Sequence, residues 1–134
     1  MKKIKGYVSS RLIDGKLISQ KIQNLVIREF CKKNNLFYNL SNVEYIYNNC
    51  FVGLYEIIEK INEFHGVVAF SFHQLPKNDD ERKKIFLKFI KLNKIFYFSN
   101  ENYKIHNIHS FENLELIIQI HKCLNNEKNY WIYH

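Results

Sequence analysis

The sequence predicts an α/β fold in which a parallel sheet forms the middle of three layers and carries helices on both faces. Short apolar runs alternate along the chain with longer segments whose apolar residues recur at helical spacing. Such an alternation is typical of parallel strands joined by right-handed helical crossovers. The chain has 134 residues, of which 46% are hydrophobic and 25% are charged, as in a folded globule. We therefore expect one α/β domain over residues 1–134, with an aromatic tail at 125–134.

Four short runs rich in β-branched or aromatic residues have the character of strands, of which the first and the third are apolar enough to be buried. We expect strands at 4–9, 36–40, 67–72 and 94–99, with a polar loop from 41 to 50. Helices are expected where apolar residues recur every three or four positions, at 18–33, at 54–64, over 85–92 and from 110 onward. Asp79 and its acidic neighbours favour the start of the third helix, and Ser110 that of the last.

The net charge of +7 is concentrated at one end of the chain. Residues 1–34 contain nine basic and two acidic side chains, whereas residues 35–134 contain eleven of each. This basic end could attract phosphate, an anionic sugar or nucleic acid, or it could be a solvated helix face.

The three cysteines, at positions 31, 50 and 123, are widely spaced and form no C-x-x-C pair. This pattern argues against a disulfide framework and for a reducing compartment, so we expect a cytoplasmic protein. The start of the chain has no apolar core of a signal peptide, and no stretch approaches the roughly 18 apolar residues of a membrane span. His106, His109 and His121 lack the spacing of a structural zinc motif, and we expect neither a metal nor a cofactor.

Ligands of open α/β sheets bind beyond the carboxyl ends of the strands, which directs attention to the loops after the first three strands. The candidate ligand-binding residues there are Ser9, Ser10, Arg11, Tyr45 and Gln74, and the candidate catalytic residues are Glu44, His73 and Cys50. Arg11 would hold an anion, because its planar guanidinium can bind phosphate or carboxylate in a bidentate manner. Otherwise it would pair with Glu44 or Glu101.

The other candidates have chemical roles that depend on their neighbours. Glu44 or His73 would exchange a proton, whereas Tyr45 would position the ligand and Ser10 and Gln74 would donate hydrogen bonds to it. Cys50 would be a nucleophile only if His73 or a helix N-terminus activated it. A structural histidine and an inert buried cysteine are the alternatives.

The plan of residues 6–101 resembles the catalytic domain of serine recombinases, the resolvases and invertases. The matching features are Gly6-Tyr7, the glutamines at 20 and 23, and an apolar strand that runs into 72–77. The resemblance implies a resolvase-like or flavodoxin-like sheet. Where that family has Y-x-R-x-S this chain has YVSSR at 7–11, and where it has D-R-L-x-R this chain has HQLPK at 73–77. Because the nucleophile and arginine positions are replaced, we expect no recombinase chemistry.

Most of the chain also resembles the sporadic carbohydrate cluster family, small bacterial proteins encoded among genes for surface polysaccharide synthesis. The residues that carry this resemblance are Ser10-Arg11, Gln20, QNLVIR at 23–28, Cys31, Tyr38, Ser41, Glu44-Tyr45, Cys50, Gly66-Val67, Ser71 and QLP at 74–76. The resemblance implies a role in capsule, lipopolysaccharide or other glycan assembly, without an assigned reaction.

These observations favour a protein that acts on, or binds, a small phosphorylated or nucleotide-linked metabolite in glycan biosynthesis. One alternative is a non-catalytic subunit that regulates a larger glycan-biosynthesis enzyme. Another is a nucleic-acid-binding protein derived from a recombinase fold. We also expect a homo-oligomer, assembled through helical surfaces or through the tail residues Tyr130, Trp131, Ile132 and Tyr133, which are too apolar to be left wholly in water.

Overall fold

The structure, a computed structural model, describes the backbone of residues 2–133 and the side chains of residues 2–125. Its centre is a five-stranded sheet with the strand order β2-β1-β3-β4-β5. The strands are β1 (Lys2–Ser9), β2 (Leu36–Glu44), β3 (Gly66–Ala69), β4 (Ile95–Phe98) and β5 (Tyr103–Ile105). The first four are parallel, and β5 pairs with β4 in the antiparallel direction.

Helices cover both faces of this sheet, which confirms the three-layer α/β prediction. They are α1 (Gln20–Lys33), α2 (Val52–Glu59), α3 (Asp79–Lys91) and α4 (Ile108–Tyr133), with short 3-10 turns η1 (Ile61–Glu63) and η2 (Phe72–Gln74). α1 packs on one face, where Ile27 meets Val8 and Val68. α2, α3 and α4 pack on the other face in a larger core that includes Phe86 and Phe96.

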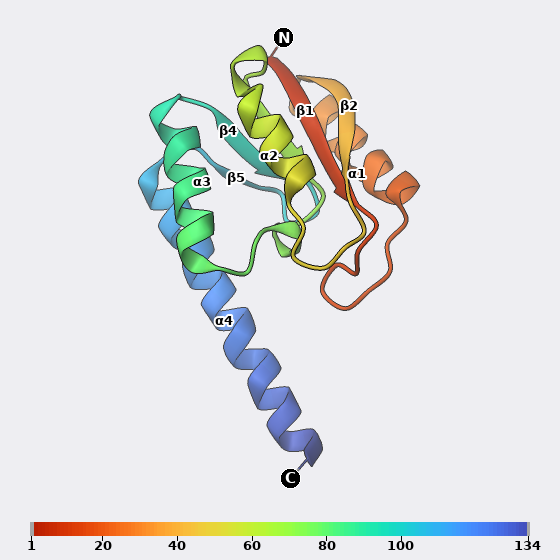
Figure 1. Ribbon diagram of the computed structural model, residues 1–134, viewed down its shortest axis with the longest axis vertical. Coiled ribbons are helices and arrows are strands. Elements are labelled where there is room, and N and C mark those ends of the chain that lie inside the picture. The colour runs from red at the N-terminus through yellow and green to blue at the C-terminus, as the bar shows by residue number, and fades with distance from the viewer. Residues whose placement is uncertain (1, 134) are drawn as a thin grey trace.

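The last helix extends well beyond the body of the molecule (Figure 1). α4 continues to Tyr133, so its backbone is helical through the polar segment after Leu124, and the division of the chain at 125 stays a prediction. The side chains of Tyr130, Trp131, Ile132 and Tyr133 lie outside the described residues, and self-association through them stays a prediction. None of the helices in the described part of the chain has the length and apolar character needed to cross a membrane.

Several predicted boundaries are wrong for identifiable physical reasons. β2 runs on to Glu44, through the residues expected to form a loop, because partners satisfy their polar side chains: Ser41 donates to Asn24 and Asn42 donates to the carbonyl of Gly53. The strand expected at 67–72 ends at Ala69. β5 was not predicted, because three residues with Lys104 at their centre carry no strand signal.

The start of α4 also differs from the expectation. Asn107 rather than Ser110 caps the helix, because the Asn107 Oδ1 atom accepts a 2.8 Å hydrogen bond from the Ser110 amide. Ser110 reaches back, and its hydroxyl accepts a 3.1 Å hydrogen bond from the Asn107 amide. This reciprocal pair is a capping box, in which Ser110 is the inner member.

Candidate anion-binding site

A cavity of about 960 Å³ opens at the carboxyl ends of the parallel strands. Four segments and one residue of α3, Arg82, line it: the segments are the loop after β1, the loop after β2, the stretch from η2 to Lys77, and the part of α4 from Ile118 to Asn125. Ser9, Ser10, Arg11, His73 and Gln74 are brought together in its lining, although they come from two separate loops. These five residues therefore share one cavity beyond the carboxyl ends of the strands, where ligands of such sheets bind.

Arg11 is held in this cavity without an acidic partner. One of its guanidinium nitrogens donates a 2.6 Å hydrogen bond to the carbonyl oxygen of Cys50, and the guanidinium lies 4.6 Å from the centre of the Phe51 ring. In the described part of the chain, no carboxylate lies within ion-pair distance of Arg11, so the expected alternative of a pair with Glu44 or Glu101 is not seen. The guanidinium has five N–H donors, of which the Cys50 carbonyl takes one, and it also lies beside the Tyr7 side chain.

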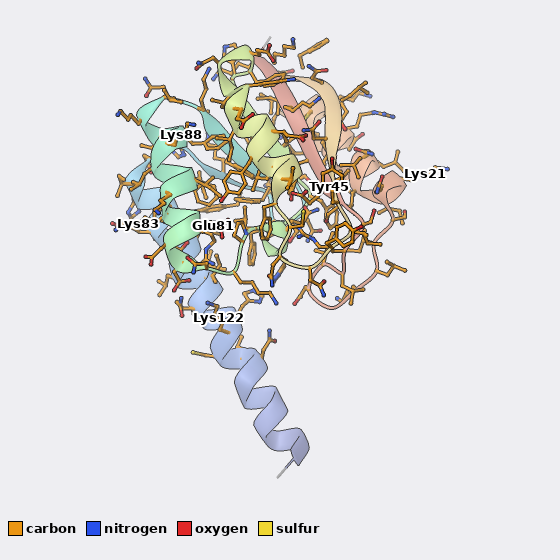
Figure 2. The ribbon with its side chains drawn as sticks, in the orientation of Figure 1. Lys21, Tyr45, Glu81, Lys83, Lys88 and Lys122 are labelled. Carbon is orange, nitrogen blue, oxygen red and sulfur yellow. The ribbon has the colours of Figure 1, made fainter. Side chains whose placement is uncertain are left out.

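Two lysines add to the positive charge of the lining. Lys77 follows η2, and Lys122 lies on α4 below α3 (Figure 2). Lys122 is 3.6 Å from a carboxylate oxygen of Asp79 at the start of α3. Sequence reasoning missed Lys122, because nothing local to α4 shows that this helix closes a cavity formed by distant loops.

Asp14 is the one acidic residue among the described residues that line the cavity. It stands at the tip of a tight turn, in which Ile13 and Lys16 exchange backbone hydrogen bonds of 2.8 and 3.0 Å. Asp14 and Gly15 have φ values of 51° and 74°, the left-handed conformations that an Asp-Gly turn of this kind requires. The turn holds the Asp14 carboxylate 3.7 Å from the His73 ring.

We expect Asp14→Asn to strengthen binding of inorganic phosphate by roughly threefold to tenfold, the effect of one like charge in a partly screened site. The substitution removes a negative charge from the cavity and keeps the shape of the side chain. Isothermal titration calorimetry measures the change, with Glu29→Gln on the exposed surface of α1 as the control. Equal affinity in wild-type protein and Asp14→Asn would contradict the prediction.

His73 is the residue of this cavity best suited to exchange a proton. Its ring lies 4.2 Å from that of Phe72 and 5.2 Å from that of His121, measured between centroids. Burial lowers the pKa of His73 below its usual value, and His121 lowers it further, whereas Asp14 and Glu101 oppose the shift. The imidazole is therefore neutral at neutral pH and can accept a proton.

The lowered pKa of His73 predicts a pH dependence of stability. Because the unfolded chain binds this proton more tightly than the native protein does, stability from this group is complete above the unfolded pKa of about 6.5 and declines as the pH falls below it. His73→Gln should lose less stability than the wild type between about pH 7 and pH 5.5. Thermal melts at each pH, with His65→Gln as an exposed control, check this, and parallel curves for wild type and His73→Gln would contradict it.

Gln74 is fully engaged inside the protein. Its amide nitrogen donates hydrogen bonds of 2.9 Å to the Ser9 hydroxyl and 3.0 Å to Gln23, and its oxygen accepts one from the Ser71 amide. Both amide hydrogens are therefore used, and the geometry makes Gln74 a residue that positions Ser9 rather than a donor to a ligand. Gln23, buried on α1, completes this network by donating to the Ser9 carbonyl.

Glu44, Tyr45 and Cys50 are not among the described residues that line the cavity. Glu44 is buried beside the start of α2, where its oxygens accept hydrogen bonds from the amides of Gly53 at 2.8 Å and Leu54 at 3.2 Å, and from the Tyr7 hydroxyl at 2.8 Å. The residue at the N-cap of α2, Phe51, has no side chain that can accept these hydrogen bonds. The expected proton exchange by Glu44 therefore gives way to a structural role, the satisfaction of a helix N-terminus by a buried carboxylate.

Tyr45 and Cys50 also differ from their expected places. Tyr45 lies on the surface at the end of β2 (Figure 2). The Cys50 thiol is 3.9 Å from a Glu44 oxygen, and the Cys50 carbonyl rather than the thiol contacts Arg11. Activation of Cys50 by His73 has no support in this arrangement. Within the described residues, no group of three or more histidine, cysteine or acidic side chains could hold a metal ion.

We expect Glu44→Gln to lower the free energy of unfolding by about 1–3 kcal/mol, because either orientation of the amide places N–H groups against backbone donors. The affinity of the folded protein for phosphate should not change, since Glu44 lies outside the cavity lining. Urea denaturation and calorimetry measure the two quantities, with Glu56→Gln on the exposed side of α2 as the control. If Glu44→Gln kept full stability and lost phosphate binding, the structural role would be wrong and Glu44 would belong to the binding site.

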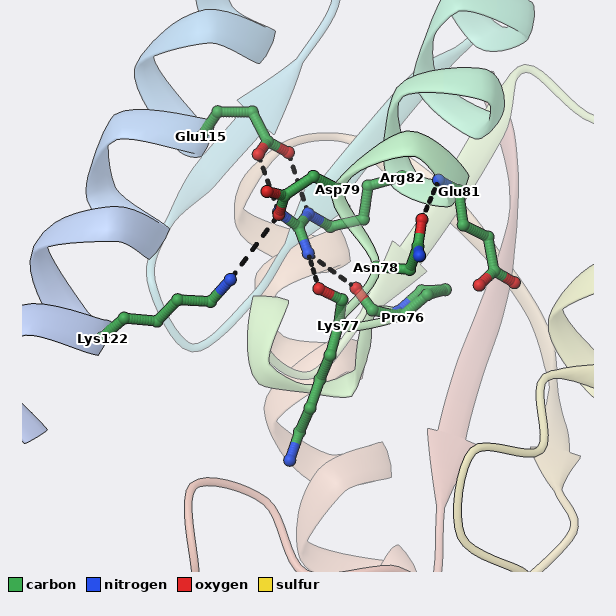
Figure 3. A network of polar contacts seen from close by, with 8 residues as sticks. All are labelled: Pro76, Lys77, Asn78, Asp79, Glu81, Arg82, Glu115 and Lys122. Atoms are coloured by element: carbon green, nitrogen blue, oxygen red, sulfur yellow. Dashed lines mark hydrogen bonds and ion pairs between the residues drawn. The ribbon is translucent and has the colours of Figure 1, made fainter. Parts of the chain in front are cut away.

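A cluster of charged side chains around the buried Arg82 joins α3 to α4 beside the cavity (Figure 3). Arg82 of α3, only 1% exposed, binds Glu115 of α4 through two hydrogen bonds of 2.9 and 2.7 Å. It also pairs with Asp79 and donates 2.9 Å hydrogen bonds to the carbonyls of Pro76 and Lys77. Sequence reasoning missed Arg82, because its position on a charged helix resembles that of any solvated arginine.

The architecture defines a class: the chain has the fold of the resolvase catalytic domain, with a five-stranded mixed sheet between helices. One similar structure is the N-terminal catalytic domain of TP901-1 integrase, with a TM-score of 0.61 at 13% identity over 91% of this chain and 97% of that one. Another is a resolvase family site-specific recombinase from Streptococcus pneumoniae, with a TM-score of 0.64 at 12% identity over 94% of this chain and 93% of that one. At such identities the likeness shows the fold alone.

No family model and no curated protein matches the chain, so the resemblance to the sporadic carbohydrate cluster family finds no support there. The resemblance to the serine recombinase catalytic domain is confirmed at the level of the fold. Arg11 stands where that resemblance expects the serine nucleophile, and it lines the cavity.

Proposed function

We propose that the protein binds a small phosphorylated or nucleotide-linked metabolite in the cavity at the carboxyl ends of its strands. The observation that carries the proposal is the Arg11 guanidinium, which is fixed by a carbonyl and an aromatic ring and has no carboxylate partner among the described residues. An arginine with free donors in a concave site is suited to phosphate. Lys77 and Lys122 supply further positive charge.

Within this site, Arg11 binds the anionic group and Ser10 lies beside it on the same loop. His73 is the residue that would exchange a proton if a reaction takes place, since its imidazole is neutral and faces the cavity. Glycan biosynthesis as the setting rests on the sequence resemblance, and an enzyme rather than a regulatory subunit as the form rests on His73 in the cavity. Both are parts of the proposal, and the geometry of the cavity is compatible with them.

The proposal is tested by a ligand screen that follows the melting temperature. Inorganic phosphate, a hexose 1-phosphate and a nucleotide sugar should each raise it in a saturable manner, whereas the neutral hexose should not, because a ligand stabilises only the state that binds it. If none of the anions stabilised the protein at millimolar concentration, the proposed function would be wrong.

A second candidate is nucleic-acid binding, and it is favoured by the basic first 34 residues together with the recombinase fold. Phosphate contacts give an affinity that falls steeply with salt, so a fluorescence titration of DNA at increasing ionic strength tests this candidate. Strand cleavage is not expected, because Arg11 occupies the nucleophile position. A covalent DNA adduct through Ser9 or Ser10 would contradict that expectation.

A further inference from the structure

The cavity that holds the cations is also lined by exposed apolar side chains. Leu12, directly after Arg11, is 63% exposed, and Ile46 on the loop after β2 is 67% exposed. Both line the cavity, as do the partly buried Phe51 and Ile118. The two loops lie side by side at the end of the sheet from which α4 projects (Figure 1).

Leu12 and Ile46 belong to neither of the buried core clusters. Scattered surface leucines need no explanation, but aliphatic side chains that converge on one cavity from two loops are a feature of binding grooves. A free phosphate or a polar sugar phosphate would leave these side chains in water. The lining therefore provides an apolar region that the anion site alone does not use.

We propose that the natural ligand joins its anionic group to an apolar chain, and that it belongs to the chemical class of alkyl phosphates. This inference rests on the proposed anion site and adds the class of molecule that occupies it. The phosphate would bind Arg11, and the chain would leave the cavity across Leu12 and Ile46. The same cavity is lined by Arg11 and by the exposed aliphatic side chains of Leu12 and Ile46, and its 960 Å³ lies at the upper end of the range for ligand cavities.

A chain-length series tests the inference. Calorimetry measures the Kd of inorganic phosphate and of butyl, hexyl and octyl phosphate, all below their critical micelle concentrations. Each fully buried methylene is worth about fourfold in affinity, so a partly covered chain should gain about twofold to fourfold per methylene. An unchanged Kd from inorganic to octyl phosphate would overturn the inference and leave the anion site intact. If neither inorganic nor alkyl phosphate bound, the proposed function would fail as well.

Variants show where the chain binds. The ratio of octyl phosphate affinity to inorganic phosphate affinity should fall at least fivefold in Leu12→Ser and in Ile46→Ser. Leu40→Ser is the matched control, because Leu40 is 74% exposed on β2 and does not line the cavity. An equal loss in Leu40→Ser would indicate non-specific adsorption and would overturn the inference. Light scattering that showed these apolar residues holding a dimer, with no effect on the affinity ratio, would assign them to an interface instead.

Discussion

Arg82→Ala is expected to lower the free energy of unfolding by about 2–4 kcal/mol, because it removes a buried side chain, several charge-assisted hydrogen bonds and the partner of the mostly buried Glu115. The guanidinium satisfies Glu115, Asp79 and two backbone carbonyls at once. No other side chain can supply this set of donors, since lysine offers one nitrogen where arginine offers three. The contacts join α3, α4 and the segment after η2, so their loss should also loosen the α4 wall of the cavity.

Urea denaturation followed by circular dichroism measures this effect. Arg28→Ala is the matched control, because Arg28 is exposed on α1 and should change stability by less than about 0.5 kcal/mol. Glu115→Gln should be milder than Arg82→Ala, since Arg82 would keep Asp79 and both carbonyls. If Arg82→Ala lost no more stability than Arg28→Ala, the cluster would not hold the helices together.

Arg11→Ala is expected to weaken phosphate binding by about tenfold to a hundredfold, the value of hydrogen bonds to a charged group. Its melting temperature should change little, because the contacts of Arg11 are a hydrogen bond to a backbone carbonyl and neutral aromatic neighbours, with no carboxylate partner among the described residues. Arg11→Lys should retain part of the affinity, since lysine keeps the charge and loses the bidentate geometry.

Thermal shift and calorimetry, run on the same preparations, separate the two roles that Arg11 could have. A binding role predicts normal melting of Arg11→Ala and a loss of phosphate-induced stabilisation. A structural role predicts a melting point many degrees lower, in a protein that phosphate does not stabilise even in its wild-type form. Arg28→Ala should behave as the wild type in both measurements.

Much of the fold could be predicted because its elements carry a local signal. The apolar runs of β1, β3 and β4 and the spacing of α1 and α3 follow from burial on one or both faces. β5 and the second half of β2 could not be predicted, because their pairing depends on neighbours distant in the chain. The hydroxyl of Ser41 is satisfied within the strand by Asn24 of α1 and by Tyr38.

The sequence could predict which segments meet at the candidate site, because the order of the strands determines that. It could not predict which way individual side chains point. The end of β1 and the segment after β3 had to meet, and Arg11 and His73 accordingly share a cavity. Whether Glu44 faces a ligand or the amides of α2 depends on a rotation that no sequence pattern encodes. The parts of the site from α4 and the buried Arg82 depend on the packing of helices far apart in the chain.

The central claim, that this cavity binds an anion through Arg11, is tested most directly by an NMR titration of 15N-labelled protein with inorganic phosphate. The account predicts saturable shifts of backbone amides in the cavity segments, at 9–15, 46–51, 72–77 and 118–125, and their loss in Arg11→Ala. Shifts that arise elsewhere, or that persist unchanged in Arg11→Ala, would contradict it.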